Sequence, residues 1–257
     1  MSAPGSPTVS LIVPAYDEEA RLGVLFEKLG ASAEGDLARA GLSYLETVIV
    51  DDGSTDATSS LLQAAAARDV RIRPILGQLR NRGKGAALAT GIAAARGEIV
   101  LLVDVDLSTP LSCARPLAEA MRAAGTPMAI GSRDLEESRV EAPLHRRLLG
   151  AGFNVAVRAL TGLRHADTQC GFKMIETGFA RELVGDRISQ GFAFDVEVLM
   201  RARNAGVEVA EVPVTYIHDA RSKVRVLRAS AEMAGDLLRL AVRLRGGRPR
   251  AETQRPR

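Results

Sequence analysis

The sequence contains no tryptophan and only two cysteines, Cys113 and Cys170. Aromatic residues make up 4% of its 257 residues, which argues against a platform for stacking nucleic acid bases. Two thiols do not form a disulfide framework, so a cytoplasmic protein is expected. The 3 histidines share no metal-ligand spacing. No zinc site is therefore predicted.

Long apolar runs are also missing. No stretch approaches the roughly 18 apolar residues of a membrane-spanning helix. The first eight residues lack the basic stretch and apolar core of a secretory signal. A net charge of +3 is too small to predict a nucleic acid partner. Any membrane contact is therefore expected to be peripheral, at the cytoplasmic face.

The chain shows no internal repeat and no linker that would divide it. We expect a disordered N-terminus over residues 1–8 and one large domain over residues 9–223. Within that domain, residues 9–131 form the first half and residues 132–223 the second. An amphipathic helix is expected over residues 224–246, followed by a basic disordered tail over residues 247–257.

Short apolar runs alternate with helical patterns in the first half, which predicts an α/β fold with a parallel, doubly wound sheet. The five predicted strands cover residues 9–14, 45–50, 71–76, 98–103 and 127–131. Right-handed crossovers would place all the strand-end loops on one edge. The second half predicts helices over 144–160 and 194–205, and an extended stretch over 207–217 interrupted at Pro213.

The fourth strand runs into two carboxylates, Asp104 and Asp106, separated by Val105. Alternate residues of an extended chain point to the same side, so both are expected together at the carboxyl edge of the sheet, where α/β proteins bind ligands. Paired carboxylates favour a divalent cation, and hard oxygen ligands favour Mg²⁺ or Mn²⁺, which also hold substrate phosphates. The alternative is a solvated turn, because Asp is common in turns.

Two other strand-end loops suit a nucleotide. Asp51 and Asp52 can accept hydrogen bonds from a base or a ribose, or can cap the next helix. Residues 82–85 combine backbone N–H groups, two cations and a helix N-terminus, which together suit a phosphate. They do not form a Walker loop, because Gly85 stands where that motif requires Ser or Thr.

Cations and a thiol stand out in the second half. Arg133 follows the fifth strand and can bind a phosphate bidentately or remain a surface cation. Arg146 and Arg147, at the start of a predicted helix, can likewise bind a phosphate or lie on a solvated helix face. Cys170 has no histidine partner pattern, so thiol catalysis is not expected.

Taken together, these loops resemble family 2 glycosyltransferases of the GT-A fold. The segments that carry the resemblance in the first half are residues 14–19, 51–56, 83–85, 104–106 and 131–133. Those of the second half, residues 167–173, 194–197, 211–214 and 222–224, resemble the dolichyl-phosphate β-glucosyltransferase branch and its polyprenyl-phosphate relatives. The resemblance implies a mostly parallel central sheet flanked by helices, with a C-terminal amphipathic helix.

The resemblance also implies site residues. Asp104 and Asp106 would hold the metal, Asp51 would contact the uracil and Lys84 would lie near the pyrophosphate. The full nucleotide-side set is Pro14, Ala15, Tyr16, Glu18, Asp51, Asp52, Gly83, Lys84, Asp104, Val105 and Arg133. The implied catalytic residues are Asp106, Asp167, Asp195 and Lys173. Arg133 and residues 167–173 would face the acceptor or the donor sugar.

The implied reaction is inverting, metal-dependent transfer of a hexose from a UDP-sugar, UDP-glucose above all, to a polyprenyl or dolichyl phosphate. A phosphate acceptor is already ionised and needs cations to hold it. A hydroxyl acceptor needs a carboxylate base, for which the candidates are Asp167, Asp195 and Glu197. The cations that favour a phosphate are Arg133, Arg146, Arg147, Lys173, Arg221, Lys223 and Arg225.

Two other functions fit the same sequence. One is a soluble transferase that acts on a small hydroxyl acceptor such as a secondary metabolite, and another is a nucleotide-sugar-binding module without turnover. The amphipathic stretch at 224–244 carries an arginine face that suits either an anionic membrane surface or a helix covering the core. A long exposed helix would also allow a homodimer.

Overall fold

The computed structural model describes residues 5–218 except 186, 187 and 192. The amphipathic helix and the basic tail predicted after residue 223 lie outside the described residues. Within the described part, no helix is both long enough and apolar enough to cross a bilayer.

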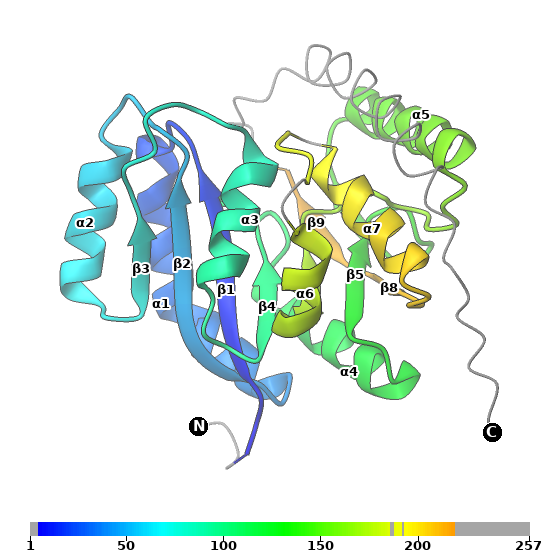
Figure 1. The fold of residues 1–257 in the computed structure, drawn as a ribbon, viewed down its shortest axis with the longest axis horizontal. Helices are drawn as coiled ribbons and strands as arrows, with labels where there is room; N and C mark the ends of the chain where they lie inside the picture. The colour runs from blue at the N-terminus through cyan, green and yellow to red at the C-terminus, as the bar shows by residue number, and fades with distance from the viewer. Residues whose placement is uncertain (1–4, 186–187, 192, 219–257) are drawn as a thin grey trace, which may run out of the picture.

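The core of the protein is a seven-stranded sheet with the order β3-β2-β1-β4-β7-β5-β8 (Figure 1). Every neighbouring pair is parallel except the two that involve β7, which runs antiparallel to β4 and to β5. The mostly parallel sheet expected from the sequence is therefore confirmed. Its strands are β1 (Thr8–Ala15), β2 (Ser43–Asp51), β3 (Ile72–Ile75), β4 (Ile99–Leu102), β5 (Met128–Ser132), β7 (Lys173–Glu176) and β8 (Ala210–Pro213).

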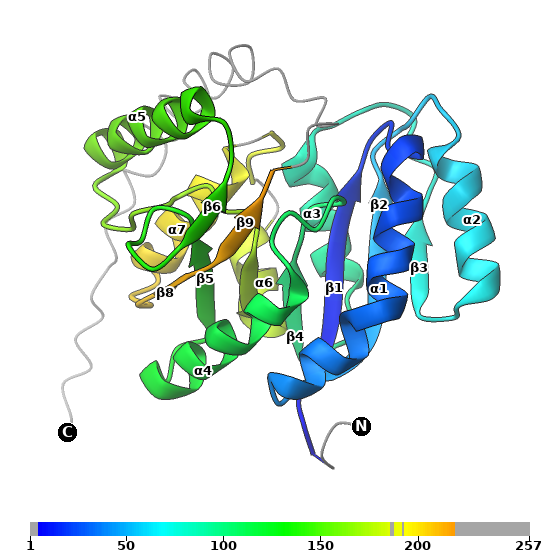
Figure 2. The same cartoon turned by 180° about the vertical axis from the view of Figure 1, so that it is seen from behind.

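Helices cover both faces of this sheet, as Figures 1 and 2 show from opposite sides. One face carries α1 (Glu19–Arg39), α2 (Thr58–Arg68) and α4 (Ala114–Ala124), and the other carries α3 (Lys84–Ala94), α6 (Thr177–Val184) and α7 (Phe194–Asn204). Leu11 of β1 packs into the first hydrophobic cluster and Ile12 into the second. Because β1 is buried on both faces, its residues from Leu11 to Ala15 form a continuous apolar run.

Strand β7 and helix α6 were not predicted from the sequence. Lys173, the first residue of β7, pairs with Leu102 at the end of β4 on one side and with Ile130 of β5 on the other. Because β7 runs against its neighbours, its start lies at the edge where β4 and β5 end. Residues 167–172, which precede it, are thereby brought to the carboxyl edge of the sheet.

A small second sheet lies over the same edge (Figure 2). It pairs β6 (Arg139–Glu141) with β9 (Thr215–Ile217) in parallel. The backbone N–H of Ile217 donates to the carbonyl oxygen of Ser108 at 2.8 Å, which fastens β9 to the loop after β4. The interruption predicted at Pro213 is the point where the chain leaves the large sheet for the small one. Helix α5 (Leu144–Thr161) lies above this edge in Figure 1.

Candidate functional site

The two carboxylates after β4 lie in a turn rather than on an extended strand. The backbone N–H of Leu107 donates to the carbonyl oxygen of Asp104 at 3.0 Å, and Leu107 has a φ of 46°. The alternation of an extended chain does not apply there. The prediction that it would place Asp104 and Asp106 side by side therefore rested on the wrong local geometry.

Each of these carboxylates has its own cationic partner. Lys84 Nζ lies 2.6 Å from Asp104 Oδ1, and Arg21 Nη1 lies 3.4 Å from Asp106 Oδ2. Burial acts to raise the pKa of Asp104, but the charges of Lys84, Lys173 and Arg133 together with the Lys84 hydrogen bond outweigh it, and the pKa is lowered. Arg21 is not predicted as a site residue from the sequence, because nothing in the helical pattern of α1 indicates that it faces Asp106.

A pocket opens at this edge of the sheet. Its walls come from the loop after β4, from the end of β5, from residues 169–172 and from β9. Asp104, Arg133 and Cys170 had been singled out from the sequence, whereas Ser108, Thr109 and Tyr216 had not. The full lining is Asp104, Ser108, Thr109, Arg133, Gln169, Cys170, Gly171, Phe172 and Tyr216.

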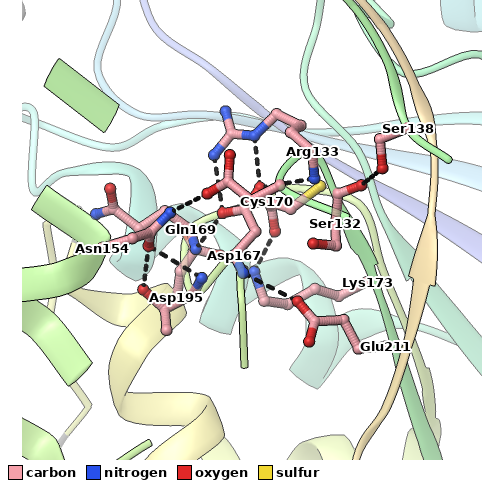
Figure 3. A network of polar contacts seen from close by, with 12 residues as sticks. Ser132, Arg133, Ser138, Asn154, Asp167, Gln169, Cys170, Lys173, Asp195 and Glu211 are labelled. Atoms are coloured by element: carbon pink, nitrogen blue, oxygen red, sulfur yellow. Dashed lines mark hydrogen bonds and ion pairs between the residues drawn. The ribbon is translucent and has the colours of Figure 1, made fainter. Parts of the chain in front are cut away.

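Arg133 enters this pocket in a fixed orientation (Figure 3). Its Nε and Nη2 donate to the two carboxylate oxygens of Asp167 at 2.6 and 3.0 Å. Its guanidinium carbon lies 5.4 Å from the ring centroid of Tyr216, within range of a cation–π contact. Burial acts to raise the pKa of Asp167, but the charge and hydrogen bonds of Arg133 lower it to about 2. Asp167 is therefore ionised at neutral pH and bound to Arg133.

The three carboxylates considered as bases for a hydroxyl acceptor are all buried. Asp167 is 0%, Asp195 4% and Glu197 0% exposed. Asp195 lies 2.5 Å from Lys173 Nζ, and Glu197 accepts hydrogen bonds from Ser189 at 2.6 and 2.8 Å. None of the three lines the pocket. Lys173 is also fully buried, so it lies beneath the pocket floor rather than in the pocket.

The loop that follows β2 is largely organised by its own hydrogen bonds. Asp51 accepts from the backbone N–H of Ser54 at 2.9 Å and from the Ser59 hydroxyl in α2. Asp17 crosses to this loop and accepts from the backbone N–H of Thr55 at 2.8 Å. Asp51 thus closes a turn before α2 and contacts a side chain of the helix, but it does not cap the backbone of α2. Its proposed contact with uracil stays a prediction.

The other nucleotide-side residues near β1 and β4 differ in exposure. The Tyr16 side chain is 41% exposed at the carboxyl edge, while Glu18 is buried and paired with Arg21. Pro14 and Ala15 close β1, and Val105 packs in the core. Of this group, only Tyr16 presents a large exposed surface to a ligand.

The glycine loop before α3 does not present a free backbone cradle. The N–H groups of Arg82 and Gly83 donate to the Asp52 carboxylate, the latter at 2.6 Å, and the N–H of Ala86 donates to the carbonyl oxygen of Gln190 at 3.1 Å. The protein itself therefore occupies the N–H groups of Arg82 and Gly83, two of the four that were expected to bind a phosphate. What this loop offers to the site is the Lys84 ammonium.

The thiol at the pocket wall is protonated at neutral pH. Cys170 is 2% exposed, and burial raises its pKa to about 11. A thiol nucleophile would need its pKa lowered instead.

The carboxylates after β4 suit a magnesium or manganese ion in donor type. Among the described residues, no three His, Cys, Asp or Glu side chains converge on one point. Mg²⁺ is commonly held by one or two carboxylates together with substrate phosphates, rather than by a cage of protein ligands. Asp104, which lines the pocket, and Asp106 would be the two carboxylates of such a site.

Comparison with known proteins gives concordant matches. The family model described as Glycosyl transferase family 2 matches residues 10–183. A dolichyl-phosphate beta-glucosyltransferase of Trichomonas vaginalis, ALG5C, is 33% identical over 95% of this chain and 74% of its own. The human dolichyl-phosphate beta-glucosyltransferase is 33% identical over 97% of this chain and 80% of its own.

The fold also matches solved structures. Glucosyl-3-phosphoglycerate synthase from Mycobacterium tuberculosis, in complex with Mn²⁺ and UDP-glucose, superposes with a TM-score of 0.66 at 19% identity. The match covers 92% of this chain and 79% of that one. This likeness establishes the GT-A fold.

Proposed function

This chain belongs to glycosyl transferase family 2, and we propose that it transfers glucose from UDP-glucose to a polyprenyl phosphate with inversion at the anomeric carbon. The names of its relatives in Trichomonas vaginalis and human support this donor sugar and this class of acceptor.

The observation that carries the choice of acceptor is that, in the part of the chain that the structure describes, none of the three carboxylates considered as a base lines the pocket. Asp167, Asp195 and Glu197 are each buried and bound to a cation or to N–H and O–H donors. A hydroxyl acceptor would need one of them to take its proton. A phosphate is already ionised at neutral pH, and Arg133 lies in the pocket to hold it.

In the proposed reaction, the bond from the anomeric carbon to the diphosphate oxygen breaks, and its electron pair leaves with UDP. A bond from the same carbon to an oxygen of the acceptor phosphate forms on the opposite face. Lys84 would stabilise the diphosphate, and Arg133 would hold the acceptor phosphate. A divalent cation held by Asp104 and Asp106 would neutralise charge that develops on the departing diphosphate.

The test is a transfer assay with purified full-length protein, UDP-glucose and Mn²⁺. Dolichyl phosphate in detergent is one acceptor and dolichol, which ends in a hydroxyl, is the matched control. We expect a glucolipid and an equal amount of UDP with the phosphate, and neither with the alcohol. A protein that glycosylated a soluble alcohol but left polyprenyl phosphates unchanged would contradict the proposal.

Two further expectations remain predictions. The amphipathic helix expected at 224–244, which suits either a membrane surface or the core, lies outside the described residues. A homodimer would require a second chain. Co-sedimentation of the full chain with anionic vesicles tests the membrane contact. Its sedimentation without vesicles tests the homodimer.

A further inference from the structure

We propose that the segment formed by residues 166–173 is held by two carboxylates with separable roles, one for each substrate. Glu211 of β8 positions Arg133 for the acceptor. Asp195 of α7, acting through Lys173, positions Gly171 against Asp104 for the donor. The assignment of the two substrates rests on the proposed function, whereas the two sets of contacts do not.

The first anchor acts at the start of the segment (Figure 3). The two carboxylate oxygens of Glu211 accept the backbone N–H groups of Ala166 and Asp167 at 3.0 and 2.9 Å. The Asp167 carboxylate in turn accepts hydrogen bonds from Nε and Nη2 of Arg133, and from the backbone N–H of Arg133 at 3.1 Å. Glu211 does not line the pocket, so we infer that its influence on the pocket passes through Asp167.

The second anchor acts at the end of the segment. Lys173 Nζ donates to the carbonyl oxygen of Cys170 and lies 2.5 Å from Asp195 Oδ1. Both side chains are buried, in a low dielectric where an unpaired charge is costly. The hydrogen bond from Lys173 thereby fixes the carbonyl oxygen of Cys170. The next residue, Gly171, lies against the Asp104 carboxylate.

The two anchors reach the segment from different elements and from opposite ends. Between them, the backbone N–H of Thr168 is held separately by Asn154 at 3.2 Å, whereas that of Gln169 is held at 3.0 Å by Asp167, which belongs to the first anchor. Loosening one end therefore leaves the hydrogen bonds of the other end in place. A segment anchored in this way can lose one substrate contact without the other.

The experiment compares Glu211→Gln and Asp195→Asn in the full chain, with Glu46→Gln as the control. Glu46 is also a buried strand carboxylate, and it accepts a backbone N–H from Arg96 at 2.8 Å, but it does not line the pocket. We expect Glu211→Gln to raise the KM for polyprenyl phosphate about tenfold and to leave that for UDP-glucose within about twofold. Asp195→Asn should raise the KM for UDP-glucose about tenfold and leave that for polyprenyl phosphate within about twofold. Glu46→Gln should change neither KM.

Asp195→Asn leaves the Lys173 charge buried without its partner, so this variant can lose its fold. The double variant Lys173→Met with Asp195→Leu removes both charges and keeps apolar packing. We expect it to fold and still to raise the KM for UDP-glucose, because nothing then holds the carbonyl oxygen of Cys170.

A measurement without substrate separates this inference from the proposed function. The Hε proton of Arg133, followed by NMR through its Hε–Nε signal, should exchange with solvent about tenfold faster in Glu211→Gln than in the wild type. In the Lys173→Met, Asp195→Leu variant it should exchange at the wild-type rate. Equal changes of both KM values in both variants, or unchanged Arg133 exchange in Glu211→Gln, would overturn the inference. A wild-type chain inactive on polyprenyl phosphate would instead refute the proposed function.

Discussion

At the scale of single residues, Gly171 shows how closely the pocket is built. A Cβ at this position would lie 2.6 Å from Asp104 Oδ2 and 3.2 Å from Lys84 Nζ. Any side chain there would press on the ion pair that links the glycine loop to the end of β4. Absence of a side chain is thus a requirement of the site and not of the backbone, because the φ of Gly171 is not positive.

We predict that Gly171→Ala lowers kcat/KM for transfer at least tenfold and changes the free energy of unfolding by less than about 1 kcal/mol. The atom in the way is the far end of a flexible side chain, so the carboxylate moves and the fold remains. Steady-state kinetics and urea unfolding test this. Gly178→Ala on α6, where a Cβ meets nothing within 4 Å, is the control and should keep full activity. A Gly171→Ala enzyme with normal turnover would show that Asp104 does not need its present position.

At the scale of elements, the start of α3 differs most from its sequence-based interpretation. Gly83 has a φ of 102°, and Cβ atoms at Gly83 and Gly85 would collide with the backbone of Gln190 and Ser189. These glycines therefore serve close packing of residues 189–191 on the helix start. The same residues in a phosphate loop would serve close approach of a ligand, and the sequence does not distinguish the two uses.

We predict that Asp52→Asn lowers the free energy of unfolding by about 1–2 kcal/mol, because a neutral amide oxygen accepts the N–H groups of Arg82 and Gly83 more weakly than the carboxylate does, and the amide NH2 would face the backbone N–H of Arg82. Urea denaturation measures this, and proteolysis near residues 77–83 should become faster. Asp69→Asn, at a surface ion pair with Arg71, is the matched control and should cost less than about 0.5 kcal/mol. If Asp52→Asn instead kept full stability and lost UDP affinity, Asp52 would be a nucleotide ligand as the sequence suggested.

At the scale of the whole molecule, the antiparallel strand β7 joins the two halves of the chain. By pairing between β4 and β5, it places residues 167–172 of the second half against Asp104 of the first. Donor-side and acceptor-side residues thus share one edge of one sheet. Ligands that bind across this edge should stabilise the entire fold.

We predict that UDP at about 100 times its Kd, in the presence of Mn²⁺, raises the melting temperature relative to Mn²⁺ alone by about 5–10 °C, as expected for about 2.7 kcal/mol of binding linkage. Either ligand alone should give a smaller shift, because the diphosphate and the carboxylates complete one ion site. Scanning calorimetry measures the shift. In Asp106→Ala, most of this shift in melting temperature should be lost and transfer should be abolished. Glu119→Ala, on exposed α4 surface, should keep both. A full shift in Asp106→Ala would refute the metal assignment.

The sequence by itself determined the order of strands and helices in the first half, and the motifs at the ends of those strands. Buried parallel strands are continuous apolar runs, and the loops between them carry Gly, Asp and Pro. Both signals are local, so they can be read without the fold. They were sufficient for the family and for the choice of Asp104, Arg133 and residues 167–173 as parts of one site.

Only the tertiary structure decided which of those residues reach a ligand. β7 has four residues and begins with a lysine, so no local pattern marks it, and its partners lie about 40 and 70 residues earlier in the chain. Its position sets the partners of the charged residues, because a buried ion takes whichever opposite charge the fold brings to it. Asp167 thereby became the support of Arg133, and Lys173 and Asp195 a pair beneath the pocket floor.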